Sequence, residues 1–421
     1  MNSKQSLLIS LMLIGILYLG NSQNLAKREQ VFSQIDSVIT DAIKHKAFPG
    51  AVLLIASKDS ILLYQAYGYH TYDSIRQVQK YHLFDLASVT KVTAGTLALM
   101  KLYDQGLLDI DQPIKEYIQG FDFNKRGKTT VRRLLSHSSG WQSWVPYYKK
   151  MIKSPGVYKK KYFATSLSDK YPVEIADSLY FTKKGYDVIK RSIKKATLKE
   201  PKEYVYSGLF SYLIPELVEN VAKVPFENFL KSNFYEAVNA ESLGFNPLKS
   251  FPDSLILPTE IDTFFRMQAI HGKVHDEGAI LMGGISANAG LFGSALDVHN
   301  VWQIFLNDGL IDSSYFLSKG TVDLFTTVQY PNEENRRGLG FDKPLLRFDS
   351  VKSSVAQRAS HLSFGHSGYT GPLVWADPKE DVLFIFLCNR VFPNRLQRQI
   401  YDLNVRPTLH AFSYLLRDFY P

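Results

Sequence analysis

The chain has 421 residues, of which 45% are apolar and 13% aromatic, and it carries 49 lysines and arginines against 40 aspartates and glutamates, a formal net charge of +9. This apolar content can bury a large core, and it excludes a disordered or low-complexity chain. The single cysteine, Cys388, excludes an internal disulfide and a cysteine-rich metal site.

The N-terminus has the pattern of a secretory signal. Residues 1–22 carry one charge, Lys4, followed by an apolar run from Leu7 to Leu19 and the small residues Gly20 and Ser22. The run is too short to cross a bilayer, which needs about 20 helical residues. We therefore predict a signal peptide over 1–22 and an exported (secreted or periplasmic) mature chain over 23–421. An uncleaved N-terminal anchor is the alternative.

Periodicity predicts the first elements of the mature chain. Apolar residues recur at helical spacing over 27–46, and a proline and a glycine at 49–50 end that helix. Two apolar runs at 51–56 and 61–67 are joined by four polar residues, which is typical of a β-hairpin. Residues 88–105 form a second predicted helix, which starts at a serine and ends before Gly106.

From Gly106 to about residue 300, helical patterns and glycine- and proline-containing loops dominate. Runs at 373–377 and 382–388 predict a second hairpin, and a final helix is expected over about 395–419. The predicted fold is thus α/β, of the α+β type. Its antiparallel sheet is built from both termini (about 27–87 and 300–421) and flanked by helices, and a large, mostly helical region (about 88–299) is inserted.

Known motifs leave one candidate for catalysis. The zinc-protease motif H-E-x-x-H and the nucleophile elbow G-x-S-x-G are both absent, and the glycines at 338 and 340 lack the third glycine of a dinucleotide fingerprint. The ten histidines do not cluster at metal-ligand spacing, so we expect no metal and no cofactor. What remains is the pattern S-x-x-K at 88–91.

This pattern has a chemical rationale. On a helix, residues three apart share a face, so the Lys91 amine is expected beside the Ser88 hydroxyl. An alcohol is a weak nucleophile until a neighbouring base takes its proton. A serine at a helix start also has a free backbone N–H that can face an oxyanion. The pattern recurs at 192–195, but there it lies in a lysine-rich run that is better explained as a solvated face.

The residues around Ser88 resemble the serine β-lactamase and penicillin-binding-protein superfamily, most closely its class C-like branch, which includes D-alanyl-D-alanine carboxypeptidases and esterases. The resemblance covers about residues 30–421. The matching stretches, in family order, are F-D-L-A-S-V-T-K at 84–91, L-L-S-H-S-S-G at 134–140, Y-V-Y-S-G at 204–208, N-A-G-L-F at 288–292 and G-H-S-G-Y-T-G at 365–371.

The resemblance implies roles for seven residues. Ser88 would be the acylated nucleophile, and Lys91 and Tyr206 would move its proton. The backbone N–H groups of Ser88 and Tyr369 would bind the oxyanion. The residues expected to contact substrate are His366, Ser367, Gly368 and Tyr369, with His366 and Ser367 facing a carboxylate or the acyl tail.

Two departures from the family bear on the substrate. Gly208 stands where the family usually has a side chain that binds the lysine and the substrate amide, and His366 replaces the lysine of most β-lactamases. Both argue against an efficient β-lactamase. A peptidase of the D-alanyl-D-alanine carboxypeptidase type or an ester hydrolase is therefore expected. The alternatives are a class C-type β-lactamase and a catalytically silent protein that binds peptidoglycan or a partner.

The positive charge is concentrated in one segment. Residues 149–202 hold 15 lysines and arginines and 5 acidic residues, a local balance of +10, which leaves the rest of the chain at −1. Either this is a solvated lysine face, or it draws anionic cell-wall polymers or carboxylate-bearing substrates toward Ser88. No nucleic-acid motif accompanies the charge, so we expect no nucleic-acid partner. The expected substrate is a small molecule or peptidoglycan-derived, and the expected state is a monomer.

Overall fold

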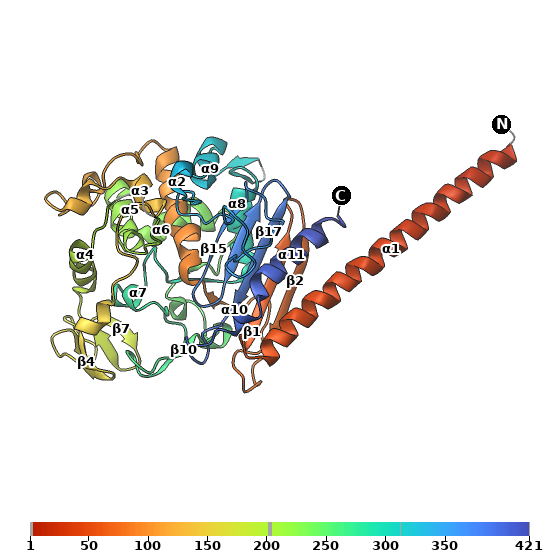
Figure 1. The fold of residues 1–421 in the computed structure, drawn as a ribbon. Coiled ribbons are helices and arrows are strands. Elements are labelled where there is room, and N and C mark those ends of the chain that lie inside the picture. Colours follow the sequence, from red (N-terminus) through yellow and green to blue (C-terminus); the bar gives the residue numbers. More distant parts are fainter. Residues whose placement is uncertain (1–2, 201–203, 312, 421) are drawn as a thin grey trace.

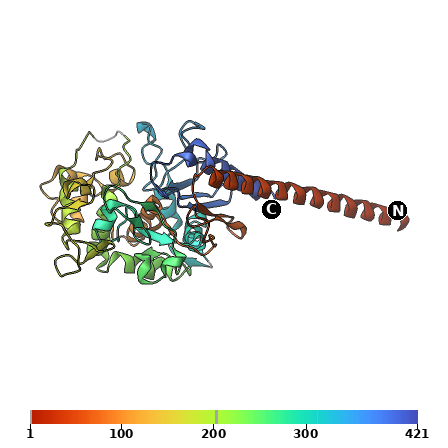
Figure 2. The ribbon, with the colours of Figure 1, turned by 90° about the horizontal axis from the view of Figure 1, so that it is seen from below.

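The computed structural model describes residues 3–200, 204–311 and 313–420, and for residues 3–23 only the course of the backbone. The first helix, α1 (Ser3–Lys44), is much longer than the 27–46 predicted, and its N-terminal half projects away from the rest of the molecule (Figures 1 and 2). Residues 1–2 and the side chains of 3–22 lie outside the described residues, so the signal peptide remains a prediction. Among the described residues, no helix combines the length and apolar character that a membrane crossing requires.

A five-stranded antiparallel sheet joins the two ends of the chain, as predicted. Its strand order is β15-β16-β17-β1-β2. The strands are β1 (Gly50–Ala56), β2 (Ile61–Gly68), β15 (Phe364–Ser367), β16 (Leu373–Asp377) and β17 (Val382–Cys388). Both predicted hairpins, β1–β2 and β16–β17, are confirmed, and β1 pairs with β17 along its length, from Ala51 opposite Cys388 to Ala56 opposite Leu383.

Helices cover both faces of this sheet (Figure 1). On one face, α1 and α11 (Val405–Arg417) pack on Leu53, Phe384 and Phe386. On the other face, α8 (Ala295–Leu306) packs on β1 and β17 within a core that includes Leu54 and Ile385. Because alternate residues of a strand point to opposite faces, β1 and β17 must be apolar throughout. This is why their sequences are unbroken apolar runs.

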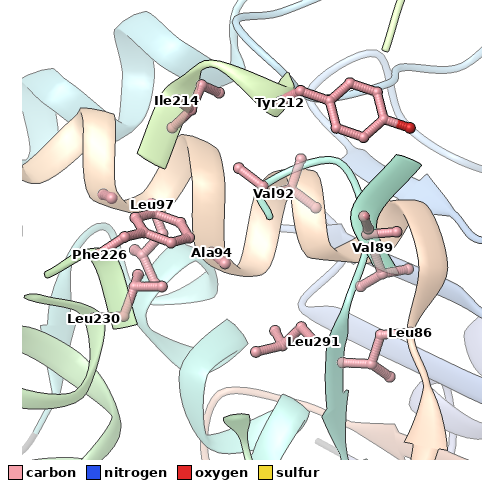
Figure 3. Packing of buried hydrophobic residues seen from close by; sticks show 14 of the residues in the cluster. Leu86, Val89, Val92, Ala94, Leu97, Tyr212, Ile214, Phe226, Leu230 and Leu291 are labelled. Carbon is pink, nitrogen blue, oxygen red and sulfur yellow. The ribbon is translucent and has the colours of Figure 1, made fainter. Parts of the chain in front are cut away.

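The helix predicted over 88–105 is present but irregular. A 3-10 turn (Ala87–Val89) leads into a π-helical stretch (Lys91–Thr96) and then into α2 (Leu97–Asp104). Its apolar side chains pack into the largest core cluster, where Val89 and Val92 lie with Leu291 and Tyr212 (Figure 3). Single π-turns often occur at functional sites, because they re-aim the side chains they carry.

The remaining elements are short. The helices are α3 (Val131–Leu135), α4 (Gly185–Lys195), α5 (Ile214–Ala222), α6 (Phe226–Leu230), α7 (Glu277–Leu281), α9 (Lys319–Thr326) and α10 (Gln399–Asp402). The strands outside the main sheet and outside 149–202 are β3 (Phe84–Asp85), β9 (Gly244–Phe245), β10 (Glu260–Ile261), β11 (Ala269–Ile270), β12 (Leu291–Gly293), β13 (Leu310–Ile311) and β14 (Ser314–Tyr315).

Two stretches differ from the sequence-based expectation. The final helix is not continuous, because Asn404 adopts a left-handed backbone (φ 50°) and separates α10 from α11. The basic segment 149–202, expected to be helical, is described up to residue 200, and over these residues α4 is its one α-helix, beside a hairpin and a three-stranded sheet. These strands are β4 (Ile152–Ser154), β5 (Val157–Tyr158), β6 (Phe163–Ala164), β7 (Val173–Ala176) and β8 (Leu179–Phe181).

A buried pair of histidines lies beyond β2. His70 Nε2 and His82 Nδ1 are 2.9 Å apart, and the backbone N–H of Gln79 also donates to His82 Nδ1. His82 Nδ1 must therefore be an unprotonated acceptor, with His70 Nε2 as the donor. Burial lowers the pKa of His70 to about 3 and that of His82 to about 4, from an ordinary value of 6.5. The folded protein thus keeps both rings neutral.

This pair predicts acid destabilisation. Below pH 6.5 these histidines bind protons in the unfolded chain but stay neutral in the folded chain. Their contribution to the free energy of unfolding is therefore complete above pH 6.5 and is lost as the pH falls toward about 4. The melting temperature should fall between pH 7.5 and pH 5 in calorimetry. His70→Gln keeps a donor but cannot be protonated, so it should reduce the dependence on pH, whereas His361→Gln, at an exposed position, should not. Identical pH profiles for the two variants would contradict this prediction.

Candidate active site

The structure brings Ser88, Lys91 and Tyr206 together. Lys91 Nζ donates hydrogen bonds to Ser88 Oγ at 2.9 Å and to the backbone carbonyl of Asn288 at 2.8 Å. The Tyr206 hydroxyl donates to Ser88 Oγ at 3.3 Å. Lys91 is buried, with 5% of its surface exposed, whereas Ser88 is half-buried. The serine hydroxyl therefore lies within proton-transfer distance of two groups that can act as bases.

The turn that carries Ser88 is held from both sides. Leu86 and Val89 anchor it in the core, and Ala87 between them adopts a left-handed backbone (φ 44°), which is unfavourable for an alanine. The Asp85 carboxylate accepts hydrogen bonds from the N–H groups of Ala87 at 2.8 Å and His275 at 2.7 Å. Burial raises the pKa of Asp85. Local strain and a buried carboxyl group thus fix the direction of Ser88.

The end of β15 meets this turn at Gly368. A Cβ on residue 368 would lie 2.8 Å from the carbonyl oxygen of Leu86 and 3.3 Å from the Cβ of Ala87. Thr370 Oγ1 also donates to the carbonyl of Asp85 at 2.8 Å. The glycine therefore allows the edge of the sheet to approach the nucleophile closely, which the sequence motif did not explain.

Tyr369, on the same loop, lies at the mouth of the site. Arg390 donates to its carbonyl oxygen from Nε at 3.0 Å and from Nη2 at 2.7 Å, which fixes the peptide plane. Within the described residues no acceptor is bonded to the N–H of Tyr369. An oxyanion site formed by the N–H groups of Ser88 and Tyr369 remains a prediction.

His366 is not placed as expected. Its side chain is buried, and it does not line the cavity at Ser88, nor do Ser367 and Gly368. Its Nδ1 donates to the carbonyl of Ser367 at 2.7 Å, and burial together with the charges of Arg337 and Lys91 lowers its pKa to about 3. A neutral, enclosed imidazole gives no charged hold on a substrate carboxylate. A contact between His366 and a substrate carboxylate therefore remains a prediction.

Arg337 was missed by the sequence analysis, which considered its segment only as a dinucleotide motif. Its guanidinium is buried, lies 5.2 Å from the ring centre of Tyr206 and donates from Nε to the Tyr204 hydroxyl at 3.2 Å. Burial alone would raise the pKa of Asp342, but the charges of Arg337 and Arg336 hold it below its usual range. The Asp342 carboxylate thus balances a cation that packs behind the tyrosine of the site.

Gly208 makes room for a side chain from another segment. A Cβ on residue 208 would lie only 2.5 Å from Asn288 Oδ1. The amide of Asn288 is oriented by its Nδ2, which donates to the Tyr212 hydroxyl at 2.9 Å and to Asp276 Oδ2 at 3.3 Å. Tyr212 in turn donates to Asp276 Oδ1 at 2.7 Å. The space of the missing side chain at 208 is therefore occupied by the Asn288 amide, which sequence comparison did not reveal.

Ser88, Lys91 and Tyr206 line a cavity of about 420 Å³. Trp144 and Tyr369 line it and are about half exposed, at 45% and 48%. Asp276, Glu277, His275 and Arg395 line its polar end.

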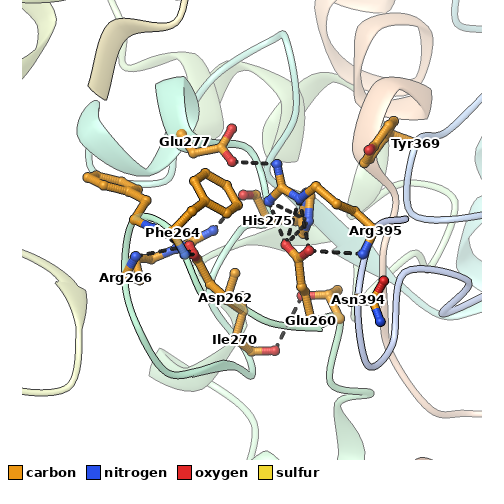
Figure 4. A network of polar contacts seen from close by, with 12 residues as sticks. Glu260, Asp262, Phe264, Arg266, Ile270, His275, Glu277, Tyr369, Asn394 and Arg395 are labelled. Carbon is orange, nitrogen blue, oxygen red and sulfur yellow. Dashed lines mark hydrogen bonds and ion pairs between the residues drawn. The ribbon is translucent and has the colours of Figure 1, made fainter. Parts of the chain in front are cut away.

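An ion-pair network stabilises this polar end (Figure 4). Arg395 donates from Nη1 to Glu277 at 2.8 Å and from Nε to Glu260 at 2.8 Å, and His275 Nε2 donates to Glu260 at 2.8 Å. Burial alone would raise the pKa of Glu260, but the hydrogen bonds from His275 and Arg395 lower it to about 2. The cavity wall is therefore charged at this end, where the ring of His275 packs 5.7 Å from that of Tyr369.

The second S-x-x-K copy lies elsewhere. Ser192 and Lys195 are in α4, where Ser192 Oγ donates to the carbonyl of Val188 at 2.9 Å and Lys195 is exposed. This fits the predicted solvated face. Of the two copies of the motif, the copy at 88–91 is the one in which the lysine contacts the serine hydroxyl. Cys388 is buried as predicted, and burial raises the pKa of its thiol to about 12.

A serine hydroxyl bonded to a buried lysine and a tyrosine, at the edge of an antiparallel sheet, is the arrangement of a serine hydrolase. The chain belongs to the beta-lactamase family, whose model matches residues 35–405. A relative in Escherichia coli O157:H7, named as a D-alanyl-D-alanine carboxypeptidase, is 30% identical over 385 residues, which cover 85% of this chain and 82% of the relative.

Solved structures share the fold at low sequence identity. EstCE1, described as a hydrolase with promiscuous acyltransferase activity, matches with a TM-score of 0.65 and 19% identity, covering 90% of this chain and 98% of its own. The octameric penicillin-binding protein homologue of Pyrococcus abyssi matches with a TM-score of 0.61 and 18% identity, covering 85% and 73%. The expected monomer remains a prediction.

The close approach at Gly368 yields a prediction. Gly368→Ala should push β15 away from the Leu86–Ser88 turn and cost about 1–3 kcal/mol of folding free energy, as overpacking usually does. It should also slow acylation of Ser88 by a fluorophosphonate probe. Gly320→Ala is the control, since nothing lies within 4 Å of an added Cβ there. Equal melting temperatures and labelling rates for both variants would contradict the proposed contact.

Proposed function

We propose that the protein is an exported serine hydrolase that acts through an acyl-Ser88 intermediate on a cell-wall-type peptide ending in D-alanyl-D-alanine. The observation that carries the proposal is the pair of hydrogen bonds from Lys91 and Tyr206 to Ser88 Oγ. The name of the Escherichia coli relative supports the peptide substrate. Export rests on the sequence pattern of residues 1–22.

The proposed reaction has two steps. Ser88 Oγ attacks the carbonyl carbon of the penultimate residue, and its proton passes to Tyr206 or Lys91, whichever is deprotonated. The C–N bond then breaks, and the leaving amine takes up that proton. In the second step, water attacks the acyl-Ser88 ester, the same group accepts the proton of the water, and Ser88 recovers its hydrogen. The backbone N–H groups of Ser88 and Tyr369 would stabilise the oxyanion in both steps.

The site favours a peptide or ester over a β-lactam. A neutral His366 away from the cavity removes the cation that most β-lactamases use, and the glycine at 208 leaves the family's usual side chain absent. Hydrolysis of an ester remains the second candidate, because an ester needs no protonation of an amine leaving group.

The proposed acyl-enzyme intermediate predicts that Ser88 can be labelled covalently. Intact protein treated with a fluorophosphonate or fluorescent penicillin should gain one label, located on Ser88 by mass spectrometry. Ser88→Ala should abolish the labelling and all turnover, and Ser192→Ala, at the second S-x-x-K copy, should leave both unchanged. A panel of D-alanyl-D-alanine peptides, short-chain nitrophenyl esters and nitrocefin then identifies the substrate. Intact, unlabelled Ser88 with wall fragments still bound would support the silent binding protein instead.

The proposed proton transfer predicts a large effect of removing the Tyr206 hydroxyl. Tyr206→Phe removes the hydroxyl at 3.3 Å from Ser88 Oγ and should lower kcat by about 10²–10⁴-fold, the usual contribution of a positioned acid-base group. Tyr204→Phe is the matched control, because its hydroxyl contacts Arg337. A Tyr206→Phe enzyme with full kcat would assign proton transfer to Lys91 alone.

A further inference from the structure

The basic segment forms a hollow beside the active site. It has a volume of about 740 Å³ and lies between one face of α4, with the two residues that follow this helix, and part of the segment 142–162. The lining residues of that segment are Gln142, Val145, Pro146, Tyr147, Lys149, Lys150, Met151, Lys161 and Tyr162. On α4, Val188, Arg191, Ser192 and Lys195 line it, at the three- and four-residue spacing of a single helix face. The second S-x-x-K copy, which has no place in the catalytic site, therefore lies in this hollow.

The charged side chains that line the hollow are all basic. Five of its lining residues are basic, and none is acidic: Lys149, Lys150, Lys161, Arg191 and Lys195. Within the part of the chain that the structure describes, none of these five forms an ion pair. By contrast, Lys190, on another face of α4, is paired with Glu216 at 2.7 Å.

Unpaired like charges around a concave surface repel one another, and a bound anion relieves that repulsion. Four of the five residues are lysines, whose ammonium groups are mobile point charges that suit repeated anionic groups better than one planar ligand. The volume and the number of cations exceed what a single small anion needs. The chemistry that fits is a linear polymer with anionic groups repeated along it.

The hollow is separated from the catalytic cavity by one short segment. Ser143 and Trp144 line the catalytic cavity, whereas Gln142, Val145 and Pro146 line the hollow.

Hydrogen bonds tie this segment to both sides. Thr197 N donates to Gln142 Oε1 at 3.0 Å, beside the hollow. Ser207 Oγ donates to the carbonyl of Gln142 at 2.7 Å, and Gly208 N donates to the carbonyl of Ser143 at 3.1 Å, beside Tyr206. A polymer in the hollow would thus lie one segment away from the substrate cavity.

We propose that this hollow is a binding site for a linear polyanion, separate from the catalytic site, that holds an anionic wall polymer next to the substrate cavity. The binding is predominantly electrostatic and does not require Ser88. Repeated phosphate and repeated carboxylate groups are the two sources of this chemistry.

The test measures binding directly. Anisotropy of labelled inorganic polyphosphate and of labelled poly-glutamate is followed with the full-length protein between 50 and 300 mM salt. We expect binding of at least one polymer that weakens steeply with salt, and Ser88→Ala should bind equally well. The tighter of the two polymers identifies the anionic group.

Two matched variants locate the site. Changing Lys149, Lys150, Arg191 and Lys195 to glutamine together should weaken binding at least tenfold at low salt and flatten the salt dependence. The control changes Lys58, Lys125, Lys249 and Lys379, all exposed and outside the segment, and should weaken binding less than threefold. Both variants should hydrolyse a small neutral nitrophenyl ester at the wild-type rate, so a failure of the catalytic proposal is seen separately.

Three outcomes would overturn the proposal. They are no binding of either polymer by the wild type, an equal loss in both quadruple variants, which would show an effect of net charge alone, and tighter binding of duplex DNA than of either polymer.

Discussion

The antiparallel pairing of β1 with β17 is the contact on which the rest of the structure depends. It joins the first strand of the chain to the last, and β2 and the β15–β16 pair are added on either side. Because only β16 and β17 separate β15 from β1, the position of Gly368 against the Ser88 turn is set by pairing between residues more than 300 positions apart. Helices on both faces bury β1, β16 and β17 throughout, so the hydrogen bonds between these strands are shielded from water.

Four of the five strands of this sheet, β1, β2, β16 and β17, could be predicted because their signals are local. A β-strand buried on both faces is a short apolar run, and the polar residues between 56 and 61 and between 377 and 382 mark the turns. The strands of 149–202 could not be predicted in this way. They are two to four residues long, and tertiary packing rather than periodicity defines them, as for Phe163 and Phe181, whose rings pack 5.0 Å apart. The break at Asn404 was missed because the apolar spacing continues on both sides of it.

The candidate site likewise combines contacts that the sequence predicts with contacts that it does not. Ser88 and Lys91 are neighbours on one turn, so their contact follows from spacing, and Tyr206 follows from family order. The surroundings that decide their chemistry do not. His366 lies in a motif that suggests a charged contact, yet its burial, together with the positive charge of the nearby Arg337, lowers its pKa to about 3. Arg337 itself reaches Tyr206 across 131 residues, and no local pattern marks it as part of the site.

The contact between Gly208 and Asn288 also limits how this sequence can change. The backbone of Gly208 is not in the left-handed region, so nothing but the Asn288 amide prevents a side chain at this position. A mutation that adds a side chain at 208 is therefore harmful while Asn288 is present and becomes tolerable once residue 288 is smaller. The two positions form an epistatic pair in which the order of substitutions matters. In this chain, a side chain at 208 therefore becomes accessible only after residue 288 has changed.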